Sequence, residues 1–106
     1  MTTITICKHN KEYVSFESKG HAEYDDPGYD IVCAAISILT INTLNSIEKF
    51  TDDDFQGEQG DGYLRWDFID SLSDKAKVLM DALIFGLETI QNNYGNEYMN
   101  IIIEEV

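Results

Sequence analysis

Apolar and polar residues alternate in two short segments at the start of the chain. Between residues 2 and 8, Ile4 and Ile6 alternate with threonines and Cys7, and a second alternating segment covers residues 13–19. A period of two residues is typical of a strand with one buried face. The polar residues 9–12 that separate the segments suit a tight turn, so the pattern predicts an antiparallel hairpin.

A long apolar segment begins after a polar loop over residues 20–29. From Ile31 to about Phe50 the apolar residues recur at helical spacing, and at the start they surround the helix almost completely. A helix without a polar face is buried. Asp30 directly precedes this segment and is a favoured N-cap residue, so we expect the helix to begin at Ile31.

The second half of the chain repeats this order of elements. The glycine-rich residues 56–62 predict a hairpin tip, and residues 63–69 alternate as a strand that we expect to pair with a weaker strand near residues 54–58. Ser71 or Ser73 is expected to cap a second helix from Asp74 to about Tyr94, which Gly95 ends. Residues 98–106 predict a last strand, with Met99, Ile101 and Ile103 facing the core.

The predicted order of elements is β-β-α-β-β-α-β. Two helices that interrupt runs of strands indicate an α+β two-layer sandwich with a mainly antiparallel sheet. The 106 residues form one expected domain, residues 1–106.

Charge and hydropathy restrict the partners of the chain. Twenty acidic and seven basic residues give a net charge of −13, which repels nucleic acid and anionic lipid and attracts a basic partner. No apolar run approaches the ~20 residues that span a bilayer, and the start of the chain lacks the pattern of a signal peptide. We therefore expect a cytoplasmic protein that binds neither nucleic acid nor a membrane.

The two cysteines, Cys7 and Cys33, are not expected to form a structural disulfide in a reducing cytoplasm. A zinc site built from both cysteines with His9 and His21 is an alternative, although the usual spacing of zinc ligands is missing. We expect no metal and no cofactor.

Cys33 is the candidate nucleophile. If Asp30 caps the helix, Cys33 lies in the first turn, where unpaired N–H groups and the helix dipole stabilise a thiolate. His21 lies on the preceding loop, which Pro27 and Gly28 can fold back toward the thiol. A stabilised thiolate and a nearby imidazole are the two parts of a cysteine nucleophile. The alternative is a buried core thiol, which is common for a free cysteine.

The residues around this pair resemble the ribosomal-processing cysteine protease family, Prp. The resemblance rests on Gly20-His21-Ala22 and on Asp30-Ile31-Val32-Cys33-Ala34-Ala35-x-Ser37, with eleven residues between His21 and Cys33. It implies a small bacterial cysteine endopeptidase that removes a short N-terminal extension from the L27-type protein of the large ribosomal subunit, and that forms a homodimer. His21 and Cys33 match the catalytic pair, and Gly20, Asp30 and Ser37 match the family's other motif residues.

This reading predicts how the remaining motif residues act. Backbone N–H groups of the first helical turn would stabilise the oxyanion, and Asp30 would cap the helix or orient His21. Ser37 follows Cys33 by one helical turn, where it would contact the site or bond to its own helix. The loop over residues 22–29 is expected to close over the bound peptide, with Tyr24 and Tyr29 in contact with the substrate.

Two alternatives belong to other functional classes. One is a catalytically silent acidic module that binds a basic segment of a ribosomal protein. The other is a redox sensor in which Cys7 resolves an oxidised Cys33, which requires the two thiols to lie close together.

Overall fold

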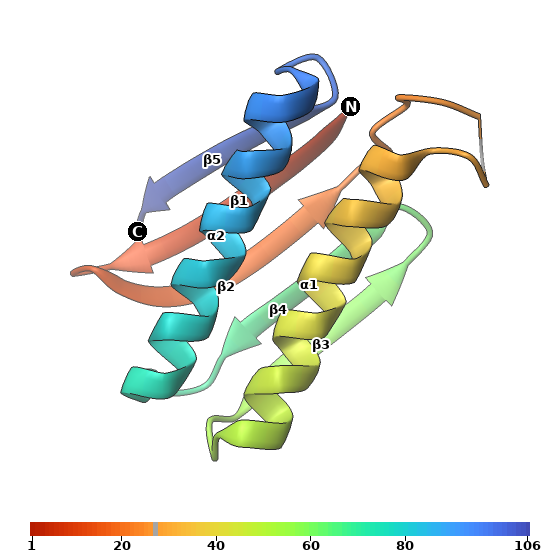
Figure 1. Ribbon diagram of the computed structural model, residues 1–106. Helices are drawn as coiled ribbons and strands as arrows, with labels where there is room; N and C mark the ends of the chain where they lie inside the picture. The colour runs from red at the N-terminus through yellow and green to blue at the C-terminus, as the bar shows by residue number, and fades with distance from the viewer. Residues whose placement is uncertain (27) are drawn as a thin grey trace.

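A computed structural model describes residues 1–26 and 28–106 and places two helices on one face of a five-stranded sheet (Figure 1). The order of strands and helices and the α+β class confirm the prediction. The elements are β1 Thr2–His9, β2 Glu12–Lys19, α1 Ile31–Phe50, β3 Phe55–Gly60, β4 Tyr63–Phe68, α2 Asp74–Tyr94 and β5 Met99–Glu105.

The sheet has the strand order β3-β4-β2-β1-β5. β1 and β2, β2 and β4, and β3 and β4 pair antiparallel, whereas β5 lies parallel to β1 at one edge. Two antiparallel hairpins therefore meet along β2 and β4. Their register pairs Lys19 with Tyr63, which brings the residues just beyond both strand ends together.

The core lies between the sheet and the helices. Phe16 of β2 stacks on Trp66 of β4 with ring centroids 4.4 Å apart, and both side chains are fully buried. The alternating side chains of β1 divide as predicted, with Ile4 and Ile6 in the core. The helices contribute fully buried Val32, Ile47, Met80 and Leu87 to the same core.

Both predicted helix starts are confirmed. Asp30 accepts a hydrogen bond from the N–H of Cys33 at 2.8 Å, and Ser73 accepts one from the N–H of Ala76 at 3.2 Å. Gly95 ends α2 with a φ of 104°, a value that glycine adopts without strain. These residues fix the starts of both helices and the end of α2.

The weaker strand expected near residues 54–58 is β3, which covers residues 55–60 and pairs with β4 over its full length. The hairpin tip is shorter than the predicted residues 56–62, because only Asp61 and Gly62 connect the strands. β3 lies at the edge of the sheet, where a strand needs few packed side chains and tolerates glycine. Ile103, expected in the core, is 56% exposed because β5 forms the opposite edge.

Helix α1 corrects two expectations from hydropathy. It is long and apolar enough to cross a membrane by length and composition alone, with a mean hydropathy of 1.5. Only 28% of this apolar window is buried and Ile38 is 69% exposed, so the expectation of a helix buried on all sides was wrong. α1 packs against α2 in the helical layer of the fold. Its buried face carries Thr40 and Thr43, whose hydroxyls donate to carbonyls one turn earlier.

Candidate active site

Asp30 organises the start of α1. One carboxylate oxygen accepts the N–H of Cys33 at 2.8 Å and the other accepts the N–H of Tyr24 at 2.9 Å. Desolvation disfavours the charged form of Asp30, but hydrogen bonds from the backbone N–H groups of Cys33, Tyr24, Asp25 and Val32 outweigh it and lower the pKa. The carboxylate is therefore a double cap that holds both the helix and the preceding loop.

Asp30 also uses backbone N–H groups of the first helical turn that were expected to stabilise the oxyanion. The N–H of Ala34 donates to the backbone carbonyl of Asp30 at 3.0 Å, and the N–H of Cys33 donates to its carboxylate at 2.8 Å. Both donors are occupied in this structure, and an oxyanion site on the first turn stays a prediction. The negative charge of Asp30 also offsets the stabilisation that the helix end offers a thiolate.

His21 lies where the end of β2 meets the tip of the β3–β4 hairpin. The N–H of Gly20 donates to the carbonyl of Gly62 at 2.7 Å. Gly20 has a φ of 93°, and a Cβ added to it would lie 2.4 Å from the backbone oxygen of Met1. Only glycine fits this position, as the motif led us to expect.

The hairpin tip also contacts the imidazole ring. A Cβ added to Gly62 would lie 2.8 Å from Nε2 of His21, so the ring occupies the space that a side chain at residue 62 would need. Oδ1 of Asp61 is 3.5 Å from the same Nε2. From the sequence, Asp61 and Gly62 are predicted only as part of a hairpin tip. Their distance along the chain from His21 does not indicate a contact, because the contact depends on the pairing of β2 with β4.

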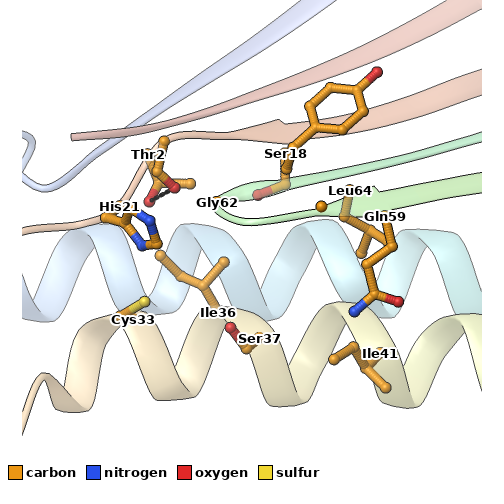
Figure 2. A pocket seen from close by; sticks show the side chains of 13 residues that line it. Thr2, Ser18, His21, Cys33, Ile36, Ser37, Ile41, Gln59, Gly62 and Leu64 are labelled. Carbon is orange, nitrogen blue, oxygen red and sulfur yellow. Dashed lines mark hydrogen bonds between the residues drawn. The ribbon is translucent and has the colours of Figure 1, made fainter. Parts of the chain in front are cut away.

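Two hollows meet at His21 and Cys33. The first has a volume of about 140 Å³, and Figure 2 shows His21 and Cys33 together at one end of it, with Ser37 and Ile41 farther along α1. Its other lining residues come from four strands, the turns beside them and α1: Thr2, Ser18, Gly20, Ile36, Gln59, Gly60, Gly62, Tyr63 and Leu64. The lining is polar and apolar in nearly equal measure and carries no acidic side chain.

The second hollow is wider, with a volume of about 930 Å³, and its chemistry differs. It shares His21, Cys33 and Ser37 with the first hollow, and its remaining residues are Glu23, Asp25, Asp26, Gly28, Asp30, Ala34 and Asp61. The acidic residues give this side of the thiol a strongly negative surface. A peptide that crosses Cys33 from one hollow to the other would meet a small uncharged hollow on one side and a wider acidic one on the other.

The other residues expected near the site, Ser37, Tyr24 and Tyr29, lie in three different places. Ser37 lines both hollows. The ring of Tyr24 makes edge-to-face contacts with Tyr94 and Tyr98, with centroid distances of 5.5 and 5.0 Å, so it anchors the loop to the end of α2. Tyr29 is 76% exposed, and substrate contact by either tyrosine stays a prediction. Pro27, which we expected to help fold the loop back, lies outside the described residues.

Cys7 lies far from this site. Thr2 lines the first hollow, and Cys7 follows it by five residues along β1, about 17 Å at the usual rise of a strand. Its side chain alternates with buried Ile4 and Ile6, so it points away from the helices. Because the thiols are so far apart, the redox alternative with a direct Cys7–Cys33 disulfide is wrong.

The four-ligand zinc site is also wrong. Nδ1 of His9 is 2.7 Å from the carbonyl oxygen of Val106, at the end of β1 that lies away from His21 and Cys33. The four residues therefore form two separated pairs. Over residues 1–26 and 28–106, no group of three or more potential ligands has the geometry of a metal site.

Comparisons with known proteins identify the family. The family model described as "Cysteine protease Prp" matches residues 1–99. A protein of Bacillus subtilis named ribosomal processing cysteine protease Prp is 34% identical over 96 residues, which cover 81% of this chain and 82% of that protein. A protein of the same name from Staphylococcus aureus is 29% identical over 78 residues, which cover 72% of this chain and 74% of that protein.

Solved structures agree with this result. The S. aureus protease Prp with a covalently linked product peptide has a TM-score of 0.93 at 25% identity, over 98% of this chain and 100% of that one. The same protease with a substrate peptide has a TM-score of 0.82 at 26% identity, over 100% of both chains. The family model and these relatives are named as cysteine proteases, which makes this chain a cysteine protease. The chain belongs to the cysteine protease Prp family.

Proposed function

We propose that this cysteine protease removes the short N-terminal extension of the L27-type protein of the large ribosomal subunit. The observation that carries the proposal is that Cys33 and His21, the pair expected from the motif, line both hollows in a fold that matches peptide-bound Prp structures. Cys33 acts as the nucleophile and His21 as the general base. Gly20 and Asp30 hold the site geometry, and Ser37 lines the path of the peptide.

The reaction follows from the chemistry of the pair. His21 takes the proton of the Cys33 thiol, and the sulfur attacks the scissile carbonyl carbon to form a C–S bond. As the C–N bond breaks, the imidazolium returns the proton to the leaving amine. Water, deprotonated by His21, then attacks the acyl-enzyme and releases the thiol.

The acidic hollow supports a basic substrate. Glu23, Asp25, Asp26 and Asp61 surround one side of the thiol in a chain that carries a net charge of −13. Ribosomal proteins are basic, and complementary charge accelerates encounter between partners. The same charge is the reason to propose that the protein binds neither nucleic acid nor an anionic membrane. A ribosomal protein as substrate is the reason to propose that it works in the cytoplasm.

We further propose that the protein works as a homodimer. The most exposed large apolar side chains on the helices are Ile38 at 69%, Val78 at 64% and Phe85 at 72%. α1 and α2 pack against each other, and a Cβ at Gly86 would lie 2.9 Å from Leu39, so Phe85 and Ile38 occupy adjoining parts of the helical layer. Covering this apolar surface with a second copy would remove it from water.

The decisive experiment is mass spectrometry of a peptide that spans the unprocessed N-terminus of the L27-type protein from the same cell. The peptide is incubated with the parent protein and with Cys33→Ala. Cleavage of one bond by the parent and none by the variant would support both the protease and its nucleophile. Cleavage by both would show that Cys33 is not the nucleophile.

The second candidate function is a catalytically silent module that binds the same basic segment. The acidic hollow is the observation that favours it, because such a surface binds cations without any thiol chemistry. Tight binding of the peptide by both proteins, with cleavage by neither, would support this alternative. A scrambled peptide with the same charge is the matched control for binding.

A further inference from the structure

We infer that the tip of the β3–β4 hairpin, Asp61–Gly62, positions His21 for catalysis, with Asp61 as the acid that orients the imidazole. The inference rests on the proposed function, because it assigns a role to residues around the proposed general base. Three independent contacts join this tip to the Gly20–His21 segment.

The contacts restrict the backbone, the ring and one ring nitrogen. The N–H of Gly20 donates to the carbonyl of Gly62 at 2.7 Å, which fixes the chain beside His21. The absent Cβ of Gly62 leaves the space that the ring fills. Oδ1 of Asp61 lies 3.5 Å from Nε2, and the other potential orienting acid, Asp30, is engaged by backbone N–H groups on both oxygens.

This geometry assigns a task to each ring nitrogen. A neutral imidazole has one N–H donor and one acceptor. If Nε2 carries the proton that faces Asp61, Nδ1 is the acceptor that takes the thiol proton and later returns it to the leaving amine. The ring then becomes an imidazolium, and the Asp61 carboxylate stabilises that positive charge.

The need for such a residue follows from the helix start. The N–H groups of Cys33 and Ala34 are used by Asp30, whose negative charge lies beside the thiol. A thiolate at Cys33 therefore depends on the positive charge of His21 more than on the helix end. His21 is itself half exposed, with 54% of its side chain accessible, so the contact with the hairpin tip is what restricts its ring.

The test compares Asp61→Asn with the parent protein in two assays. The first is alkylation of Cys33 by neutral iodoacetamide without substrate, with Cys33→Ala used to subtract reaction at Cys7. Asp61 is 99% exposed, so the substitution leaves the fold intact. We expect the alkylation rate to fall roughly 1.5- to 5-fold, the range in equilibrium constant that corresponds to an exposed ion pair.

The second assay separates positioning from substrate binding. In cleavage of the peptide, Asp61→Asn should lower kcat by a similar or larger factor and change KM less than about twofold, because a positioning group acts on the reacting state. Asp61→Glu should restore most of the loss. Glu58→Gln removes the same charge from the same hairpin outside both hollows and is expected to match the parent protein in both assays.

Gly62→Ala provides an independent variant. Its Cβ would occupy the space of the imidazole ring, and alanine is strained at the φ of 62° that residue 62 adopts. A folded Gly62→Ala protein should alkylate more slowly than Asp61→Asn, with circular dichroism to verify the fold. If it does not fold, the Asp61 variants decide the question.

Several results would overturn the inference. They are an unchanged alkylation rate in Asp61→Asn, a rise in the KM of Asp61→Asn without a fall in kcat, or an equal loss of alkylation rate in Asp26→Asn, which removes a charge from the same acidic hollow.

Failure of the proposed function would give a different result. In that case the parent protein cleaves no peptide, while Asp61→Asn still slows alkylation and Asp61→Glu still restores it.

Discussion

At the scale of single residues, the site depends on which polar groups are already occupied. Asp30 binds the N–H groups of both Cys33 and Tyr24, so one side chain fixes the nucleophile, the helix start and the loop together. Gly20 and Gly62 act through the absence of a side chain, since each leaves space that a neighbouring group fills. The chemistry of Cys33 and His21 thus depends on residues that take no part in bond making.

Substitution of Asp30 separates its capping role from a direct catalytic role. Asp30→Ala removes both acceptors and should lower the free energy of unfolding by about 0.5–2 kcal/mol, the usual cost of losing an N-cap. Asp30→Asn keeps one acceptor and should cost less. Because Asn also removes the negative charge beside the thiol, alkylation of Cys33 should be at least as fast as in the parent protein.

Chemical denaturation and iodoacetamide labelling measure the two effects. The control is Asp25→Asn, which removes a charge from the same loop without removing the cap. If Asp30→Asn retains full stability but loses both alkylation and peptide cleavage, Asp30 acts on His21 and the capping interpretation is insufficient.

At the scale of elements, the regular pattern of the sequence predicted most of the fold. The strand predicted from the alternation in β1 and the helices predicted from the spacing in α1 and α2 are present in the structure, because burial of one face produces these patterns. β3 was predicted only as a weak strand near residues 54–58, two residues short of its end, since an edge strand with Gly57 and Gly60 has no packed face to impose a pattern. The contact of Asp61 and Gly62 with His21 was missed because it depends on the pairing of Lys19 with Tyr63, which local sequence does not encode.

A polar joint connects the two helices and gives the fold a dependence on pH. The carboxylate of Asp53, just after α1, accepts hydrogen bonds from both the hydroxyl and the N–H of Ser73, the N-cap of α2. The Ser73 hydroxyl is the largest cause that lowers the pKa of Asp53 below 3.8, against desolvation, with further help from the Ser73 N–H and Thr51. The charged form of Asp53 therefore stabilises the folded state.

The sign of the pH effect follows from this lowered pKa. The stabilisation is fully present above the unfolded pKa of about 3.8 and is lost as pH falls through the lower folded value. We expect the thermal unfolding midpoint of the parent protein to drop more steeply than that of Asp53→Asn between about pH 5 and pH 3. Asp52→Asn, one residue away, should keep the steep drop, and equal slopes in all three proteins would contradict the role of this joint.

At the scale of the whole molecule, the two faces of the helical layer have different uses. The inner face fills the core, while the outer face leaves Ile38, Val78 and Phe85 exposed. If a second copy covers this surface, Phe85→Glu should place a charge in an apolar interface and shift the dimer toward monomer. We expect light scattering at micromolar concentration to show a dimer for the parent protein and a mostly monomeric variant.

Thr89→Glu is the matched control, since it adds the same charge one turn along α2. It should weaken the dimer less than Phe85→Glu does. A dimer that persists in Phe85→Glu would place the interface on another surface, and a monomeric parent protein would contradict the proposed assembly.

The net charge of −13 belongs to the whole molecule and affects how a basic peptide reaches the site. Salt screens such a field, with a Debye length of about 10 Å at 0.1 M ionic strength. We expect kcat/KM for the basic peptide to fall roughly tenfold as ionic strength rises, mainly through KM, because screening slows steered encounter and leaves the chemical step unchanged. A peptide with its lysines replaced by glutamine should show little dependence on salt. Equal salt dependence for both peptides would mean that the acidic surface serves solubility, and that Glu23, Asp25 and Asp26 do not guide the substrate to Cys33.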